Sequence, residues 1–177
     1  MKSKLFLVFI TLLFAGCGGI NLSSFGEEKK VVTLDKVNLY LKKSLPKRMK
    51  ASFGKMKIIA ITALPGDKKN SLDFMVYFNI VTFEIPEGLN GSVTATSSLR
   101  FTPYNHLLYP KDINVTNLSF ANQSLIEYVS NSAKSSIPKL AKAFLSSKDI
   151  YSLPTVKAKK LSKFETTPDG KLILYFK

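Results

Sequence analysis

Few side chains in this chain have the types and spacing that catalysis or metal binding requires. The 177 residues include one histidine, His106, and one cysteine, Cys17. A serine–histidine–aspartate triad would need His106, with Asp112 close by in the sequence, but the chain has no Gly-x-Ser-x-Gly turn to hold the serine. It also lacks a glycosidase-like carboxylate pair and a phosphate-binding glycine loop. The sequence therefore predicts no enzyme activity, no metal site and no cofactor, and it places His106 in a loop between prolines.

Cys17 is the one reactive side chain whose surroundings indicate a specific chemistry. It follows the small residues Ala15 and Gly16, an apolar run over residues 5–14 and a lysine-containing start. This arrangement is typical of a secretory signal. Small residues directly before a cysteine resemble the bacterial lipobox, which implies cleavage after Gly16 and attachment of acyl chains such as palmitate to Cys17. The alternative is an ordinary secretory signal that happens to contain a cysteine.

The residues that follow the cysteine predict a tether. Glycine, serine and glutamate are frequent there, which is typical of a flexible linker. We therefore divide the chain into a signal peptide at residues 1–16, a flexible tether from Cys17 at residues 17–30 and a single domain at residues 31–177. The lipobox resemblance implies an anchor in a membrane, and Gly18 in place of an aspartate favours the outer membrane.

The chain is strongly basic, with 26 Lys and Arg against 12 Asp and Glu and a formal net charge of +14. Such a charge favours an anionic neighbour, and in a cell envelope this would be lipid headgroups or an envelope polymer. A basic surface without a specific partner is the alternative. The basic runs lack the interleaved aromatic residues of a nucleic-acid groove, so we expect no nucleic-acid partner.

The longest amphipathic stretch runs from Ser124 to Ser147. Its apolar residues recur at helical spacing, at Leu125, Val129, Ala133, Ile137, Leu140 and Phe144. Ser124 and Glu127 predict a capping box at the start of the helix. Pro138 lies inside the pattern and predicts a kink, because it removes a backbone hydrogen bond and clashes with the preceding turn. We therefore expect one long, bent helix with a broad apolar partner.

The remaining segments predict a short helix and a set of strands. The helix is expected at residues 34–45, and the strands at residues 55–64, 72–85, 92–102, 112–120 and 172–176. Residues 103–110 are expected to form a loop, and a bulge is expected around Asn117. Meandering strands with segregated helices indicate an α+β fold, and long strands curl. We expect a strongly curved antiparallel β-sheet wrapped around the kinked helix.

A basic cluster follows the short helix, at Lys42, Lys43, Lys47, Arg48 and Lys50. Cations at the C-terminal end of a helix stabilise it through the helix dipole. The cluster is therefore interpreted as support for the helix end.

Apolar side chains of the expected strands and long helix could line a slot for a lipid or another apolar ligand. The candidates are Phe74, Val76, Phe78, Leu99, Phe101, Val129, Ile137 and Phe144. Small residues at Ala95 and Ser97 leave room beside them, and the strand at residues 72–85 is apolar on both faces. The alternative is that all eight candidates fill the core, as apolar stripes commonly do.

The order of these features resembles a known family. A lipobox precedes a short helix with the sequence Leu-Asp-Lys-Val-Asn-Leu-Tyr-Leu, a sheet, an apolar helix containing Pro138 and a closing strand after Pro168-Asp169-Gly170. Over about residues 30–177 this is similar to the YceB-like bacterial lipoproteins, a family of unassigned function. The resemblance implies a fold similar to half of a TULIP (BPI-like) lipid-binding module, in which a curved antiparallel sheet is rolled around a long helix, and it implies no catalytic motif.

Two functions follow. The first is a membrane-anchored envelope lipoprotein that binds a lipid or another apolar ligand between sheet and helix. The second is a structural or interaction lipoprotein with a solid core, which binds an envelope partner through its basic surface and the loop residues Tyr104 and Tyr109. Both are lipid-anchored in the cell envelope, at the outer membrane on its periplasmic or surface side. The residues around Asn114 also resemble a bacterial N-glycosylation acceptor, although an expected strand position argues against modification.

Overall fold

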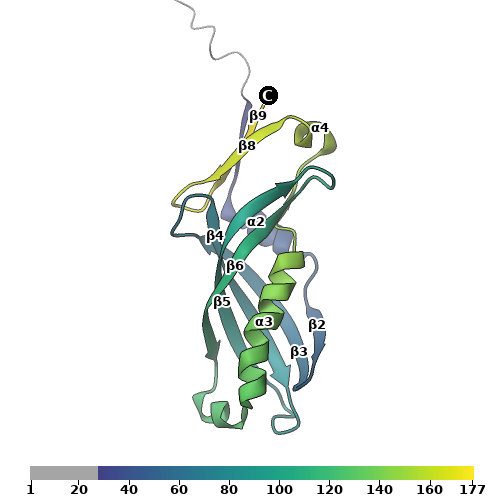
Figure 1. Ribbon diagram of the computed structural model, residues 1–177, viewed down its shortest axis with the longest axis vertical. Helices are drawn as coiled ribbons and strands as arrows, with labels where there is room; N and C mark the ends of the chain where they lie inside the picture. Colours follow the sequence, from purple (N-terminus) through teal and green to yellow (C-terminus); the bar gives the residue numbers. More distant parts are fainter. Residues whose placement is uncertain (1–27) are drawn as a thin grey trace, which may run out of the picture.

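The computed structural model describes residues 28–177 (Figure 1). The expected signal peptide, Cys17 and the tether as far as residue 27 lie outside the described residues. The described chain has an α+β fold of antiparallel strands and few helices, which confirms the expected fold class. In chain order the elements are β1 (Glu28–Val32), α2 (Leu34–Lys42), β2 (Lys47–Ala51), β3 (Gly54–Pro65), β4 (Ser71–Val81), β5 (Leu89–Thr102), β6 (Leu107–Phe120), the 3-10 helix η2 (Gln123–Tyr128), α3 (Asn131–Ser147), β7 (Tyr151–Ser152), α4 (Thr155–Ala158), β8 (Leu161–Thr166) and β9 (Leu172–Phe176).

The strands of residues 28–177 form two antiparallel sheets. The larger has the strand order β2-β3-β4-β5-β6-β7, and the smaller has the order β1-β9-β8. Helix α3 lies along one face of the larger sheet, where it packs mainly on β6, and α2 packs on β3 (Figure 1). Neither sheet is closed or strongly curled, so the expected wrapping of a curved sheet around a kinked helix is not confirmed.

Alternation along the strands separates a buried inner face from an outer face. In β4 the side chains of Phe74, Val76 and Phe78 are fully buried, whereas Tyr77 between them is 40% exposed. This strand, expected to be apolar on both faces, therefore buries one of them completely. The inner face and the buried stripe of α3 form one continuous apolar core. The outer face is left to polar, charged and half-exposed side chains.

The long amphipathic stretch is divided differently from the prediction. The 3-10 helix η2 comes first, the chain is extended at Val129 and Ser130, and α3 begins at Asn131. The expected capping box is wrong, because the Ser130 side chain accepts from the Ala133 amide at 3.2 Å and so caps α3. Helix α3 runs on through Pro138, so the break lies eight residues before the expected kink.

Four strands were not expected. Residues 47–51 form β2 at the edge of the larger sheet, so the interpretation of Lys47, Arg48 and Lys50 as a helix end is wrong. Residues 28–30 belong to β1, so the expected tether extends three residues too far. Residues 161–166 form β8, and residues 151–152 form the short β7. β1, β2 and β8 are edge strands that carry one or more basic residues, which is common because charge discourages pairing with other chains.

Of the irregular segments predicted from the sequence, one loop was wrong, whereas a bulge and a turn are confirmed. Residues 107–110, expected in a loop, pair with β5 as the start of β6. The register of β5 and β6 shifts between Thr94 and Ala95, opposite Asn117 and Val115, which confirms the expected bulge. The turn that ends in Gly170 is confirmed; Gly170 has φ +77°, and a Cβ there would lie 2.5 Å from Leu34 Cδ1. Only glycine tolerates both conditions.

The two sheets meet near the start of β4. The backbone amide of Thr166 in β8 donates to Asn70 Oδ1 at 3.1 Å, directly before β4. From Ser71 the strand β4 then runs about 33 Å to Val81. Val81 therefore lies at the end of the larger sheet that is far from the smaller sheet. In Figure 1 the smaller sheet is at the top of the domain, and β4 runs from near it towards the bottom.

The observed start of α3 makes a prediction about helix capping. Ser130→Ala removes the side-chain oxygen that accepts from the Ala133 amide, and a lost N-cap costs about 1 kcal/mol. We expect this loss in the free energy of unfolding measured with urea. Ser124→Ala, in the 3-10 helix, should cost less than half as much. A larger loss for Ser124→Ala would instead place the helix start where the sequence predicted it.

Candidate functional site

The eight candidate lining residues lie in the apolar core. Seven of them are buried, with exposures of 9% or less, and Phe101 is partly buried against the same cluster. Phe78 packs edge-to-face on Phe120, with 5.9 Å between ring centroids. The grooves described below are lined by other residues. The structure therefore places all eight candidates in or against the apolar core.

His106 and Asp112 are not brought together as a catalytic pair. His106 lies in the turn between β5 and β6 with φ 60°, and Asp112 lies six residues further along, about 20 Å for extended chain. The Asp112 carboxylate accepts from the Ser98 hydroxyl at 2.9 Å and lies 3.8 Å from Lys111 Nζ. Serine and aspartate therefore meet without the histidine that nucleophilic catalysis would require.

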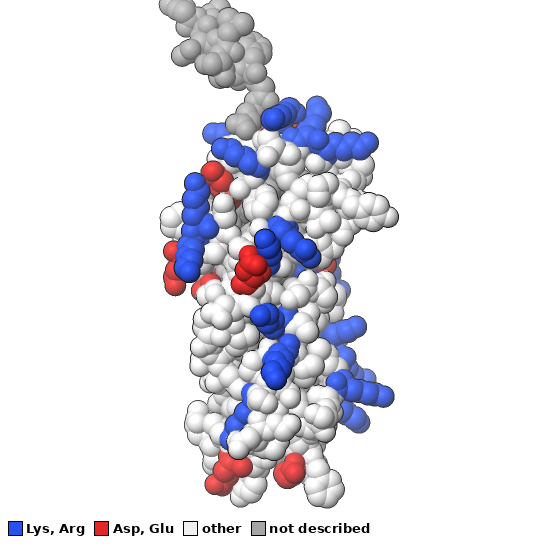
Figure 2. Space-filling view, in the orientation of Figure 1, with Lys and Arg blue, Asp and Glu red and all other residues white. Residues whose placement is uncertain are grey.

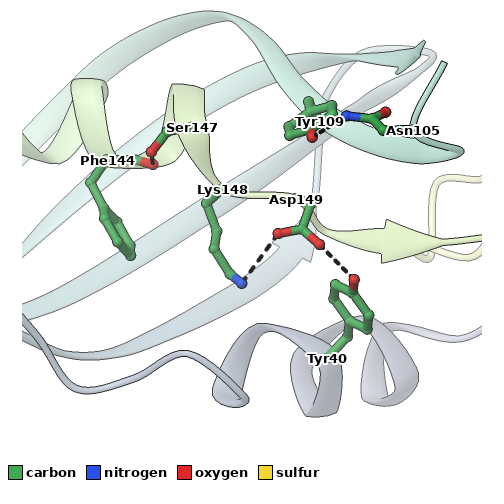
Figure 3. A network of polar contacts seen from close by, with 7 residues as sticks. All are labelled: Tyr40, Asn105, Tyr109, Phe144, Ser147, Lys148 and Asp149. Carbon is green, nitrogen blue, oxygen red and sulfur yellow. Dashed lines mark hydrogen bonds and ion pairs between the residues drawn. The ribbon is translucent and has the colours of Figure 1, made fainter. Parts of the chain in front are cut away.

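A buried polar network joins α2 to the end of α3 (Figure 3). The Tyr40 hydroxyl donates to Asp149 Oδ2 at 2.5 Å, and Lys148 Nζ lies 3.5 Å from Asp149 Oδ1. Lys148 is only 8% exposed, and its Nζ also lies 5.7 Å from the centre of the Tyr40 ring. An opposite charge and an aromatic face together stabilise an ammonium group away from water. Lys148 is thus held between the Asp149 carboxylate and the face of the Tyr40 ring.

Burial has a measurable consequence for Tyr40. It raises the pKa of the Tyr40 phenol to about 12, and the hydrogen bond to the Asp149 carboxylate acts in the same direction. The neutral phenol is the form that donates to Asp149, so ionisation would remove the hydrogen bond and place two negative charges side by side. The network is therefore a structural tie between α2 and the segment after α3.

A polar groove of about 480 Å³ lies on the outer face near the start of β4. It includes Asp67, Asp73 and Asn114; Asn114 lies in a strand, β6, as expected, and its side chain is exposed. Asp73 Oδ1 is buried without a hydrogen-bond partner in the described part of the chain, and burial followed by the nearby Asp67 raises the pKa of Asp73. Residues 28–177 contain no group of three or more His, Cys, Asp and Glu side chains that could hold a metal ion.

A second groove of about 470 Å³ lies at the remote end of the outer face; we call it the basic groove. Its lining residues are Arg48, Met49, Lys50, Lys55, Met56, Lys57, Asn79 and Val81. Strand pairing places Arg48 directly opposite Lys57 and Lys50 directly opposite Lys55. Like charges opposite each other in an antiparallel pair are destabilising. Within residues 28–177 none of these four cations forms an ion pair.

Another basic surface lies where β1 begins. Glu28 of β1 and Leu161 of β8 both pair with Phe176 of β9, so the turn that carries Lys159 and Lys160 lies beside the first described residue. Val156 of α4 is 71% exposed. The turn after β5 also reaches this region, because the Leu153 amide donates to the His106 carbonyl at 2.9 Å, and Tyr104 in that turn is 95% exposed.

We call this surface the small-sheet end and define it by Tyr104, Val156, Lys159 and Lys160. Figure 2 shows Lys and Arg side chains gathered at this end of the domain, and a second group along the edge formed by β2 and β3. Lys157 nearby is neutralised by an ion pair with Glu28, whose pKa it lowers. Lys159 and Lys160 form no ion pair within the described range 28–177. Their charge is therefore available to a partner.

Comparison with known proteins gives no assignment: no protein-family model matches the chain, and no curated protein matches it. Among residues 28–177, no helix is both long enough and apolar enough to cross a membrane.

Sequence reasoning missed the basic groove. Its signal was the alternation of basic and apolar residues in Lys47–Ala51 and again in Gly54–Ile58, which is a strand pattern with a charged outer face. The pairing of the two segments was also indicated by their separation by two residues. Tyr104 was correctly expected to be exposed, whereas Tyr109 accepts from Asn105 Nδ2 at 2.7 Å and is partly buried.

The polar network predicts a loss of stability at high pH. The pKa of Tyr40 is higher in the folded state, about 12, than the ordinary value of 10, so folding favours the protonated phenol. This contribution is complete below pH 10 and is lost as the pH rises towards 12. We expect the urea midpoint of the wild-type protein to fall more steeply over this range than that of Tyr40→Phe. Tyr104→Phe, at an exposed position, should follow the wild type, and identical slopes for all three proteins would contradict the prediction.

The like-charge pairs predict that one charge reversal stabilises the fold. Lys57→Glu places opposite charges where Arg48 and Lys57 now repel each other. We expect a gain of about 0.5–1 kcal/mol in the free energy of unfolding. Lys139→Glu, on the exposed side of α3, changes the net charge equally and should alter stability by less than about 0.5 kcal/mol. A destabilised Lys57→Glu variant beside a neutral control would show that the pair does not repel.

Proposed function

We propose that this chain is a bacterial envelope lipoprotein whose domain docks on the anionic surface of the membrane that anchors it. In this proposal Cys17 is acylated after removal of residues 1–16, and the small-sheet end faces the lipid headgroups. The observation that carries the proposal is that the described chain begins at the end where Lys159 and Lys160 are exposed and, within residues 28–177, form no ion pair. Gly18 supports the outer membrane as the location.

The geometry fits such docking. Residues 18–27 can span at most about 35 Å, so an acylated Cys17 would keep the start of β1 close to the membrane surface. Each lysine near an anionic lipid surface contributes about 1 kcal/mol at low salt. Val156 and Tyr104 beside the lysines add exposed apolar and aromatic surface of the kind that enters a headgroup layer.

The core supports the second of the two expected functions. Seven of the eight candidate lining residues are buried within the one apolar core, which is expected of residues that fill a solid core. We further propose that α3 on the six-stranded sheet corresponds to the helix-and-sheet unit of the YceB-like lipoproteins, with their likeness to half of a TULIP module. The docking proposal does not depend on a ligand between sheet and helix.

The proposal is tested by labelling lysines in the full chain, extracted from membranes and reconstituted into vesicles. Acetylation is quantified by mass spectrometry in phosphatidylcholine vesicles with and without phosphatidylglycerol. Anionic headgroups should slow the labelling of Lys159 and Lys160 at least threefold, and added salt should remove the difference because it screens surface charge. Lys139 and Lys142, exposed on α3, serve as the internal control and should label equally in both vesicles.

The anchor is tested on the same material. The N-terminal peptide of the wild-type protein should begin at Cys17 and carry the added mass of acyl chains, and Cys17→Ser should carry none. Unmodified Cys17 would refute the anchoring, and equal labelling of Lys159 in both vesicles would refute the docking. An apolar molecule extracted from the purified protein in a one-to-one ratio would favour the ligand-binding function instead.

A further inference from the structure

The basic groove holds four cations that the fold forces together. Arg48 and Lys50 on β2 lie directly opposite Lys57 and Lys55 on β3, and all four side chains are exposed. Directly opposed residues have Cβ atoms about 5 Å apart, and alternate residues along a strand are about 7 Å apart. The four charges therefore form a compact rectangle that repels itself. The repulsion among these cations weakens the fold, and binding a ligand with several negative charges would relieve it.

The floor and rim of the groove are suited to more than a simple ion. Val81, on the same face as the lysines, supplies apolar lining, whereas Met49 and Met56 point towards the core. Asn79 lies at the rim, and its Nδ2 donates to Asn90 Oδ1 at 3.0 Å. Within residues 28–177 the other polar atom of each amide, Asn79 Oδ1 and Asn90 Nδ2, makes no side-chain hydrogen bond. The pair therefore presents one acceptor and one donor to a ligand.

The groove continues across the outer face. A shallower depression of about 210 Å³ lies beside it and is lined by Tyr77, Asn90, Gly91 and Ser92, among others. Its residue Asn90 is hydrogen-bonded to Asn79, which lines the basic groove. Tyr77 is 40% exposed, so a face of its ring is available for stacking. Cations, paired amides and an exposed aromatic ring in one extended depression match a ligand that has negative groups, hydroxyl groups and flat ring faces. Charged sugar polymers have all three.

The position of the groove distinguishes a polymer from the anchoring membrane. Lys55 pairs with Val81, at the end of β4 that is about 33 Å from the smaller sheet. The small-sheet end is the part that the proposed anchor would hold against the headgroups. The basic groove would then face away from that membrane, towards the polymers of the envelope. This one step rests on the proposed function, whereas the chemistry of the groove does not.

We infer that the basic groove binds an anionic glycan, a sugar polymer that carries carboxylate or phosphate groups. Arg48, Lys50, Lys55 and Lys57 neutralise its charges, the Asn79–Asn90 pair binds its hydroxyl groups and Tyr77 stacks on a sugar ring. A guanidinium fork binds two oxygens of one carboxylate or phosphate, which gives Arg48 the orienting role among the four cations.

The test measures binding of fluorescently labelled deca-galacturonate by anisotropy, with the full chain in non-ionic detergent. The same oligomer with its carboxylates methyl-esterified is the uncharged comparator, and it should bind at least tenfold more weakly. Arg48→Glu/Lys50→Glu should also lower the affinity at least tenfold. This variant places a glutamate opposite each lysine, so the sheet loses a repulsion and its melting temperature should not fall.

The matched control is Lys139→Glu/Lys142→Glu, which changes the net charge equally on the exposed face of α3. It should lower the affinity less than threefold, and an equal loss would overturn the inference in favour of general charge attraction. Tyr77→Ala should weaken galacturonate binding at least threefold and leave binding of inorganic polyphosphate unchanged. A Tyr77→Ala variant that binds both as the wild type does would overturn the glycan assignment.

A membrane ligand is tested in mixed micelles with and without phosphatidylglycerol. If the basic groove serves headgroups, Arg48→Glu/Lys50→Glu will abolish micelle binding while galacturonate fails to bind, which overturns the inference. Binding of galacturonate together with an unmodified Cys17 would sustain the groove assignment while refuting the proposed anchor. The two proposals therefore fail in distinguishable ways.

Discussion

The inner face of the six-stranded sheet is apolar across its width, and its burial under α3 and α2 is the interaction on which the other features depend. Phe74, Val76 and Phe78 alternate with exposed residues along β4, so a shift of one residue in register would turn the core towards water. Burial of each such side chain contributes about 1.5–3 kcal/mol. This burial favours one register among the strands of the larger sheet, and that register decides which residues lie on the outer face.

That constraint explains how repulsive pairs persist on the outer face. Arg48 opposite Lys57 costs at most about 1 kcal/mol, which is small beside the burial of Met56 and Ile58 on the inner side of the same strand. The inner face therefore holds the cations together although they repel one another. In the buried network near α2, by contrast, Lys148 is matched by Asp149, because an unmatched charge inside the protein would be far more costly.

Part of this structure could be predicted from short-range features of the sequence. Gly170 ended a turn that could be recognised, and the alternation in residues 172–176 identified β9. The start of α3 could not be predicted from the sequence. Leu125 and Val129 continue the helical spacing of apolar residues, whereas the break before Asn131 depends on the position of the end of β6. The four-cation groove required the register of the β2–β3 hairpin, which could be predicted only if Lys47–Ala51 was first recognised as a strand. Each of its lysines alone is indistinguishable from a solvated surface residue.

The smaller sheet joins the first described strand to the last, with Glu28 of β1 paired to Phe176 of β9. Because a chain is synthesised from its N-terminus, β1 cannot pair until β9, about 140 residues later, has been made. Closing so long a loop is slow relative to forming the hairpins of the larger sheet, so that sheet is expected to form first. Until then, the charges of Lys29 and Lys30 keep the unpaired β1 segment soluble and discourage it from pairing with strands of other chains. Pairing of β9 with β1 is then the last step in forming the smaller sheet.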